Sequence, residues 1–292
     1  MHAIDTQTGT ERWRYTGLTG FEPPLMFADG TLLVDDGGAV YGLRATAGEV
    51  DWQFSRQDSE ILGVRVGGGR VFVSVTDSEQ ATVTHALDSG TGAERWETAG
   101  DVRAYADTTL YGADQNGDIQ AVDAETGDRR WRSPESAEGV IAVTDTTVYS
   151  VQPDNLPIRT RGTSDTPEDR ATAHAIDTTT GTVTWERGDV SGYMRPTVVD
   201  DTLVLSTAGQ LSPLLHDPEI IGLDTATGER TWGWPVPREA STRSPIVVDG
   251  RMYVVNGDAL YAVKTDTDGS SRDAATLHGV NGHHGGWVYG GG

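Results

Sequence analysis

Short apolar runs alternate with polar turns along the whole chain, and this pattern predicts strands rather than helices. The segment from Pro24 to Val34 shows the unit, which is an apolar run, the dipeptide Asp29-Gly30 and a second apolar run. Asp-Gly between two apolar runs is a strong signal for a β-hairpin. We expect further hairpins at the segments with the same pattern, which are 63–75, 104–113, 140–151, 196–206 and 245–255.

A second pattern lies between these hairpins. It consists of an apolar pair, the sequence Asp-x-x-Thr-Gly, and a tryptophan four residues after the glycine, as at Asp5, Gly9 and Trp13. Asp and Thr side chains can bond their own backbone, and glycine supplies a positive φ, so the motif predicts a tight turn between two strands. Tryptophan has a large apolar surface and one N–H to satisfy, so we expect it to pack between neighbouring sheets. The copies end at Trp13, Trp52, Trp96, Trp131, Trp185 and Trp232.

Two copies depart from the motif. The second copy has Arg44 in place of the aspartate but keeps Gly48 and Trp52. The seventh copy runs from Ala262 to Gly269 and has Asp273 where the tryptophan is expected. Both departures leave the predicted strand–turn–strand pattern readable.

A hairpin followed by one motif makes four antiparallel strands, and radial repetition of four-stranded sheets is a β-propeller. The sequence therefore predicts an all-β chain that forms one domain over 1–292. We expect a first blade shared between 1–15 and 276–292, so that N- and C-terminal strands close the ring. This makes seven blades, with eight as the alternative. The complete blades are expected at 20–55, 59–98, 101–133, 138–187, 193–234 and 243–273.

Two stretches, Asp249 to Val263 and Gly117 to Trp131, carry a family resemblance that extends over essentially the whole chain. They resemble the PQQ-like, or quinoprotein-type, β-propeller repeat, which is similar in kind to WD40-like repeats. The style is closest to that of BamB-like propellers. That resemblance implies a non-catalytic scaffold that binds a protein or peptide partner outside the cytoplasm, at the cell surface.

Another branch of the same family consists of quinone-dependent dehydrogenases, so a quinone- or metal-dependent oxidoreductase is the alternative function. Several of those enzymes have a vicinal cysteine pair beside the cofactor and a calcium site. This chain contains no cysteine, and we could not place a set of calcium ligands. We therefore expect neither PQQ nor calcium, and no catalytic or metal-binding residue is predicted.

The charge narrows the range of partners. The chain has 44 acidic and 22 basic residues, a formal net charge of −22, and Lys264 as its only lysine. This composition resembles that of proteins from haloarchaea, in which molar salt screens self-repulsion; an acidic protein from a GC-rich genome is the alternative. Nucleic-acid binding needs clustered basic residues, which are missing here.

The sequence also bears on membranes and targeting. No apolar run approaches the about 18 residues of a membrane-spanning helix, so we expect no direct membrane insertion. Residues Met1 to Trp13 lack a basic region followed by an apolar stretch, so the chain itself predicts no signal peptide. We expect a monomer.

Two insertions between predicted strands are candidate partner-binding segments. Residues 152–173 contain Arg159 and Arg161, and residues 207–219 contain Leu211, Leu214 and Leu215. They belong to adjacent predicted blades and to the same face, opposite the Asp-x-x-Thr-Gly turns. An apolar patch on a polar protein is typical of a partner site; loops that are disordered or pack on themselves are the alternative.

Charged residues also stand near the beginnings of the predicted first strands, which line the channel of a propeller. A ring of mixed charge there could hold a carboxylate or a peptide, because arginine binds carboxylates bidentately; mutual ion pairing is the alternative. The segment from Asp114 to Asp118 is spaced like a calcium loop, but Asn116-Gly117 predicts a hairpin turn. The residues of the predicted ring are Glu22, Arg103, Glu138, Arg195 and Arg243.

Overall fold

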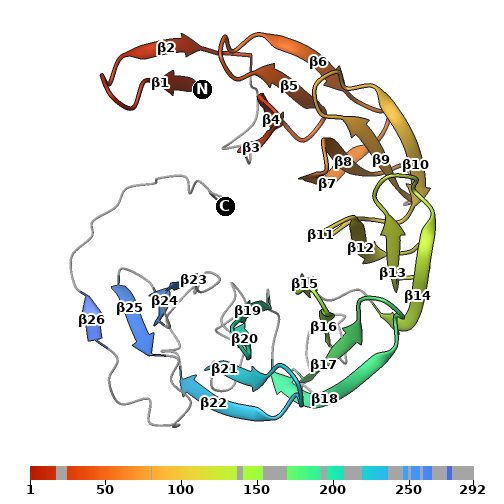
Figure 1. The fold of residues 1–292 in the computed structure, drawn as a ribbon, viewed down its shortest axis with the longest axis vertical. Coiled ribbons are helices and arrows are strands. Elements are labelled where there is room, and N and C mark those ends of the chain that lie inside the picture. The colour runs from red at the N-terminus through yellow and green to blue at the C-terminus, as the bar shows by residue number, and fades with distance from the viewer. Residues whose placement is uncertain are drawn as a thin grey trace, which may run out of the picture. The chain divides into compact units, whose positions relative to one another are not determined.

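All regular structure that can be described in this chain is β-strand (Figure 1). No helix within the described ranges is long and apolar enough to cross a membrane. The computed structural model describes residues 1–17, 25–79, 81–136, 141–153, 170–191, 196–206, 219–235, 246–248, 251–256, 259–264 and 275–277.

The described strands form six four-stranded antiparallel sheets and one two-stranded sheet, in two compact units that meet in the chain between Arg132 and Ser133. In each four-stranded sheet, the strands pair in chain order. The strands that begin in the first unit are β1 His2–Ile4, β2 Glu11–Arg14, β3 Leu25–Ala28, β4 Thr31–Asp35, β5 Val40–Arg44, β6 Val50–Phe54, β7 Glu60–Gly67, β8 Arg70–Thr76, β9 Thr82–Asp88, β10 Glu94–Ala99, β11 Ala104–Ala106, β12 Thr109–Ala113, β13 Asp118–Asp123 and β14 Arg129–Ser136. Those of the second unit are β15 Ile141–Val143, β16 Thr147–Pro153, β17 Arg170–Asp177, β18 Val183–Ser191, β19 Thr197–Val199, β20 Thr202–Ser206, β21 Glu219–Asp224, β22 Arg230–Pro235, β23 Ile246–Val248, β24 Arg251–Asn256, β25 Ala259–Lys264 and β26 Ala275–Leu277.

These sheets confirm the all-β prediction and the four-stranded antiparallel blade. One predicted boundary is wrong, because β26 pairs with β25 and extends the last sheet to Leu277 rather than to residue 273. Strands β1 and β2 form a two-stranded sheet, as expected of half a blade. The C-terminal strands that were predicted within 276–292 to complete it lie almost wholly outside the described residues, which end at Leu277. The number of blades and the closure of a ring therefore stay predictions.

The turn between the third and fourth strands forms as its sequence predicts. In the sheet β7–β10, Oδ1 of Asp88 accepts hydrogen bonds from the backbone N–H and the hydroxyl of Thr91, at 3.0 and 2.8 Å. Gly92 has a φ of +68° and donates its N–H to the carbonyl of Asp88 at 2.9 Å. Backbone N–H groups bond the equivalent aspartates in the same way, at Asp5, Asp123, Asp177 and Asp224.

The motif tryptophan packs on the glycine of the next turn, which confirms its predicted structural role. Trp52, at the end of one sheet, lies against Gly92 of the following sheet and donates its N–H to the carbonyl of Ser89 at 3.0 Å. Only glycine leaves room for the indole there. Equivalent N–H bonds join Trp13 to Ala45 at 2.8 Å and Trp185 to Thr225 at 2.9 Å.

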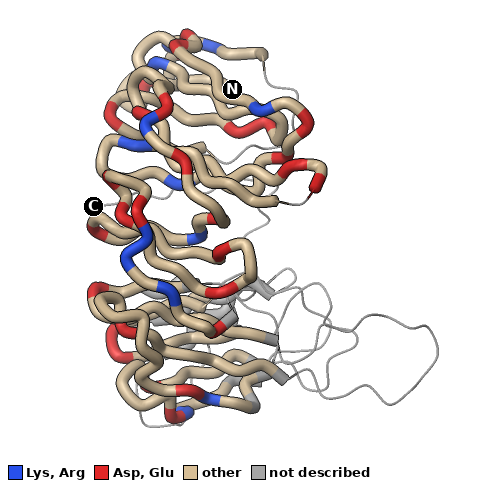
Figure 2. The backbone as a smooth tube through the Cα atoms, turned by 90° about the vertical axis from the view of Figure 1, so that its right-hand side faces the viewer, with Lys and Arg blue, Asp and Glu red and all other residues tan. Residues whose placement is uncertain are grey.

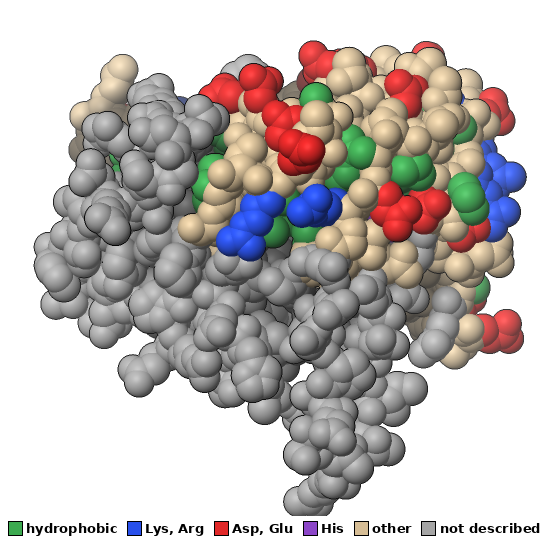
Figure 3. All heavy atoms as spheres, turned by 90° about the horizontal axis from the view of Figure 1, so that it is seen from below, with side chains coloured by type: hydrophobic (Ala, Val, Ile, Leu, Met, Phe, Trp, Pro, Cys, Tyr) green, Lys and Arg blue, Asp and Glu red, His purple; other side chains and the backbone are tan. Residues whose placement is uncertain are grey.

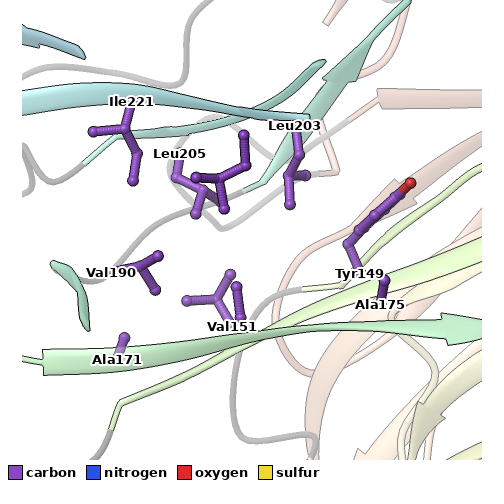
Figure 4. Packing of buried hydrophobic residues seen from close by; sticks show 10 residues of the cluster. Tyr149, Val151, Ala171, Ala175, Val190, Leu203, Leu205 and Ile221 are labelled. Carbon is purple, nitrogen blue, oxygen red and sulfur yellow. The ribbon is translucent and has the colours of Figure 1, made fainter. Parts of the chain in front are cut away.

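Apolar clusters fill the space between adjacent sheets. In the first unit, one cluster includes Leu33, Val40 and Val73, and another includes Phe72 and Leu110. In the second unit, side chains of β16, β17 and β18 face side chains of β20 and β21 (Figure 4). Because every cluster draws on two sheets, packing between blades forms the core.

Candidate functional site

Of the predicted site residues, Arg103 alone lies in the part of the chain that the structure describes. It directly precedes β11, the first strand of its sheet, as expected. The other predicted site residues lie outside the described ranges, and their roles stay predictions. They are Glu22, Glu138, Arg195 and Arg243 of the charged ring and Arg159, Arg161, Leu211, Leu214 and Leu215 of the insertions.

Arg103 pairs with an acid of its own strand entry. Its Nε donates to Oδ2 of Asp101 at 2.8 Å, and the Asp101 Oδ1 accepts the N–H of Ala113 at 2.7 Å. The carbonyl of Arg103 accepts a bond from Nε of Arg65, on the first strand of the preceding sheet, at 2.7 Å. These interactions favour the alternative in which Arg103 forms an ion pair within the protein, at the start of its strand. They do not favour a role for Arg103 in binding a carboxylate ligand.

The first strands of two adjacent sheets carry exposed apolar side chains that the sequence analysis missed. Leu25 and Phe27 of β3 are 55% and 62% exposed, and Leu62 of β7 is 51% exposed. Strands β3 and β7 are in contact, while the residues between these side chains pack into the core beneath. Consecutive apolar residues in both strands were the signal, because a half-buried strand normally alternates with polar residues.

The two insertions leave adjacent sheets of the second unit at corresponding places. The first joins β16, which ends at Pro153, to β17, and the second joins β20, which ends at Ser206, to β21. Both therefore connect a second strand to a third strand, as predicted. Directly beneath, Val151 and Ala171 belong to the same buried cluster as Leu205 and Ile221 (Figure 4). This packing holds the four strand ends together.

The Asp-x-x-Thr-Gly turns, which form the opposite ends of the sheets, are occupied by their own contacts. In five of the four-stranded sheets, the turn bonds the hairpin of its own sheet, as in the N–H of Ser89 to the carbonyl of Gly69 at 3.1 Å. Hydrogen bonds from Arg95 and Arg130 hold the pKa values of Asp88 and Asp123 at about 2. Figure 2 shows acidic residues on turns of both units.

The departure at Arg44 keeps the ion pair of the motif with its charges exchanged. In three other copies, at Asp5, Asp88 and Asp123, the aspartate pairs with an arginine seven residues later, as Asp88 does with Arg95 at 2.8 Å. In the second copy, Arg44 pairs instead with Asp51, seven residues later, and with Glu49 at 3.0 Å. The missing aspartate is therefore compensated within the same turn.

The segment from Asp114 to Asp118 is a hairpin turn, as predicted. Gly117 has a φ of +83° and donates its N–H to the carbonyl of Asp114 at 3.0 Å. Arg132 pairs with both carboxylates, at 2.9 Å from Asp114. One guanidinium is therefore shared by both carboxylates.

A second cluster unites a buried histidine with two acids on the sheet β7–β10. His85 of β9 is 5% exposed, and its Nδ1 lies 3.0 Å from Oε1 of Glu94 and 3.6 Å from Oε2 of Glu97, both on β10. Arg56, which follows the preceding sheet, bonds the other oxygen of Glu94 and lies 4.6 Å above the ring of Phe54. Burial alone would raise the pKa of Glu94, but the hydrogen bonds from His85 and Arg56 outweigh it and lower the pKa.

Comparison with known proteins identifies relatives of the fold. Residues 1–104 and 79–291 match the family model described as outer membrane protein assembly factor BamB. BamB from Moraxella catarrhalis is 19% identical, with a TM-score of 0.59 over 91% of this chain and 76% of that chain. No curated protein matches the chain in sequence.

WD40-type propellers are similar in structure as well. A chain of the mitotic checkpoint complex gives a TM-score of 0.60 at 12% identity, over 91% of this chain and 86% of that chain. The C-terminal WD40 domain of Sif2 gives 0.56 at 11% identity, over 83% and 66%. At these identities, the likeness shows a shared fold alone.

Proposed function

Because this chain belongs to the family of outer membrane protein assembly factor BamB, we propose that it is a non-catalytic β-propeller scaffold that binds a protein or peptide partner. The solved relatives support this proposal, since one is an assembly factor and another comes from a multiprotein complex. We place the partner outside the cytoplasm, at the cell surface, and take the chain to act as a monomer.

The observation that carries the proposal is that the two insertions start from strand ends that pack together in one buried cluster. The repeat residues are used for turns, for ion pairs and for contacts between sheets, so they leave little side-chain chemistry for a ligand. The insertions depart from the repeat and start from strand ends joined by the cluster of Val151, Ala171, Leu205 and Ile221. Loops on a rigid scaffold are where binding residues concentrate.

The exposed apolar side chains of the first unit give a second, independent support. Leu25, Phe27 and Leu62 stand on neighbouring first strands and are more than half exposed. Figure 3 shows acidic, basic and apolar side chains interspersed on the described part of one face. Exposed apolar groups rimmed by polar residues are typical of surfaces that bind other proteins.

Deletion of the insertions tests the proposed face. Replacing 154–169 and 207–218 by short Asn-Gly turns keeps β16, β17, β20 and β21 intact, because the deleted segments lie beyond the described strands. We expect partners captured by photo-crosslinking in molar potassium chloride to be lost. The matched control alters exposed positions of the opposite turns, Glu125→Lys with Ala226→Lys, and should keep them. Undiminished capture by the deletion variant would refute this face.

The oxidoreductase alternative has its own readout. The chain would be incubated with pyrroloquinoline quinone and calcium, and reduction of an acceptor dye would be followed with alcohols and sugars. We expect no turnover above the cofactor-free control. Sustained turnover would overturn the scaffold proposal, whatever the crosslinking shows.

A further inference from the structure

We propose that His85, Glu94 and Glu97 form a binding site for a divalent transition-metal ion, with Zn²⁺ as the best fit. The three side chains each offer one ligand atom, and these atoms all lie within 4.8 Å of one another. An imidazole nitrogen with two carboxylate oxygens is a donor set that Zn²⁺ accepts, with a water molecule as fourth ligand. The nitrogen favours zinc over Mg²⁺ and Ca²⁺, which prefer oxygen ligands.

The spacing of the ligand atoms fits this ion. Tetrahedral zinc with bonds of about 2.0–2.2 Å places its ligand atoms about 3.3–3.6 Å apart. Nδ1 of His85 lies 3.6 Å from Glu97, within that range, and 3.0 Å from Glu94, which would move away by about 0.3 Å. The imidazole is held by burial and by the ring of Phe54, at 5.2 Å between centroids. Glu97 is 65% exposed and can close on an ion from the solvent side.

The surrounding charges allow the ion to enter. In one tautomer of His85, Nδ1 donates its proton to Glu94; an ion at Nδ1 requires the other tautomer, in which Nε2 carries the proton, so binding moves the proton from one ring nitrogen to the other. Arg56 bonds Oε2 of Glu94 and leaves Oε1 directed at His85. Arg56 also lies 3.4 Å from the His85 Nδ1, so we expect it to withdraw from the nitrogen while it keeps Oε2. A hydrogen-bonded carboxylate is the usual outer support of a metal ligand.

The other described copies of the repeat lack at least one member of the set. In the N-terminal copy, His2 bonds Glu11 at 2.7 Å, but the residue paired across the strands with His2 is Arg14, which itself bonds Glu11 at 3.2 Å. In the sheet β7–β10, the residue paired across the strands with His85 is Glu97.

In the sheet β15–β18, the histidine and its cross-strand acid are present as His174 and Glu186, but the residue equivalent to Glu94 is Val183. Within the described residues, only the sheet β7–β10 combines all three ligands.

Binding would stabilise both the pairing of two strands within one sheet and the contact of that sheet with the preceding one. Two ligands on β10 and one on β9 would clamp the outermost strand pair of this sheet. Through Glu94, the ion would also fix Arg56, which comes from the preceding sheet. We therefore expect the ion to strengthen the contact between adjacent sheets, although it lies at the edge of one.

Zinc titration of the whole chain, stripped with a chelator, tests the site. The titration would follow competition with a chromophoric chelator in molar potassium chloride with excess Mg²⁺, which occupies oxygen-only sites. We expect one tightly bound Zn²⁺ per chain and Co²⁺ absorption bands typical of a tetrahedral site. Glu97→Gln should weaken binding at least about tenfold, and Glu97→Arg, which copies the arrangement at Arg14, should abolish it.

Matched variants make the outcome decisive. Glu97 is exposed, so its substitution leaves the buried packing in place, whereas His85→Gln needs a circular dichroism check of folding. His2→Gln removes an exposed histidine–glutamate pair and should leave zinc binding unchanged. Equal affinity of the wild type and Glu97→Gln, or loss of binding in His2→Gln, would overturn the proposed site.

Discussion

Trp52 packs directly on Gly92, so a methyl group added at this glycine should lower stability in two ways. It would strain the backbone, and it would clash with the indole that joins the two sheets. Gly92 has a φ of +68°, and a Cβ built there would lie 2.7–2.8 Å from atoms of Trp52. Gly9 occupies the same place in the first copy with a φ of +71°, but a Cβ built there meets no atom within 4 Å. Gly92→Ala and Gly9→Ala therefore share the backbone cost and differ in the clash.

The two changes should differ in size. Placing alanine in the left-handed region costs about 1–2 kcal/mol, while reduced freedom of the unfolded chain offsets about 0.4–1 kcal/mol. Overpacking adds about 1–3 kcal/mol, and it applies to Gly92 alone. We expect a loss of about 1 kcal/mol in the free energy of unfolding for Gly9→Ala, and of about 2–4 kcal/mol for Gly92→Ala.

Urea unfolding at constant molar potassium chloride measures both values. Gly117→Ala is a further control inside a four-stranded sheet, since Gly117 has a φ of +83° and open space around it. We expect Gly117→Ala to behave like Gly9→Ala. Equal losses for Gly92→Ala and both controls would refute the reasoning that the indole needs a glycine beneath it.

Three further predictions concern charge. The carboxyls of Asp88 and Asp123 have pKa values of about 2 against an ordinary 3.8. Their contribution to stability is therefore present above pH 4 and is lost as the pH falls towards 2. NMR titration of both side chains would contradict this if their pKa values were near 3.8. Arg44→Asp should lower the free energy of unfolding by about 0.2–1 kcal/mol, as for other exposed pairs, and a second change, Asp51→Arg, should restore it in urea unfolding. The net charge of −22 predicts a melting temperature that rises from low salt to molar potassium chloride, because salt screens self-repulsion; a flat response in calorimetry would remove the argument for a halophilic protein.

Sequence reasoning was most successful where a residue's partner is close in the chain. Oδ1 of Asp88 bonds Thr91, three positions away, and the Asn116-Gly117 turn closes on Asp114. Such contacts depend on local backbone geometry, so a short motif specifies them. The strand order followed from the repeat for the same reason, because consecutive antiparallel strands need only short turns.

The candidate sites were less predictable from sequence. The position of Arg103 before a first strand was correct, yet its pairing with Asp101 and its contact with Arg65 depend on two adjacent sheets. The cluster around His85 was missed, because its members come from β9, β10 and the segment after β6. Glu97 and Arg14 occupy the same place in the repeat, directly after the tryptophan. Only the strand register shows that this place faces the histidine of the neighbouring strand.

The sequence by itself determined the strands, their order within each sheet, the Asp-x-x-Thr-Gly turns and the acidic surface, since these follow from local conformation and composition. It also predicted that tryptophans pack between sheets. Only the tertiary structure decided which atoms they touch, how Arg44 replaces an aspartate, and where His85 meets two carboxylates. Those contacts join residues brought together by strand register and by packing between sheets, and this proximity is absent from the linear chain.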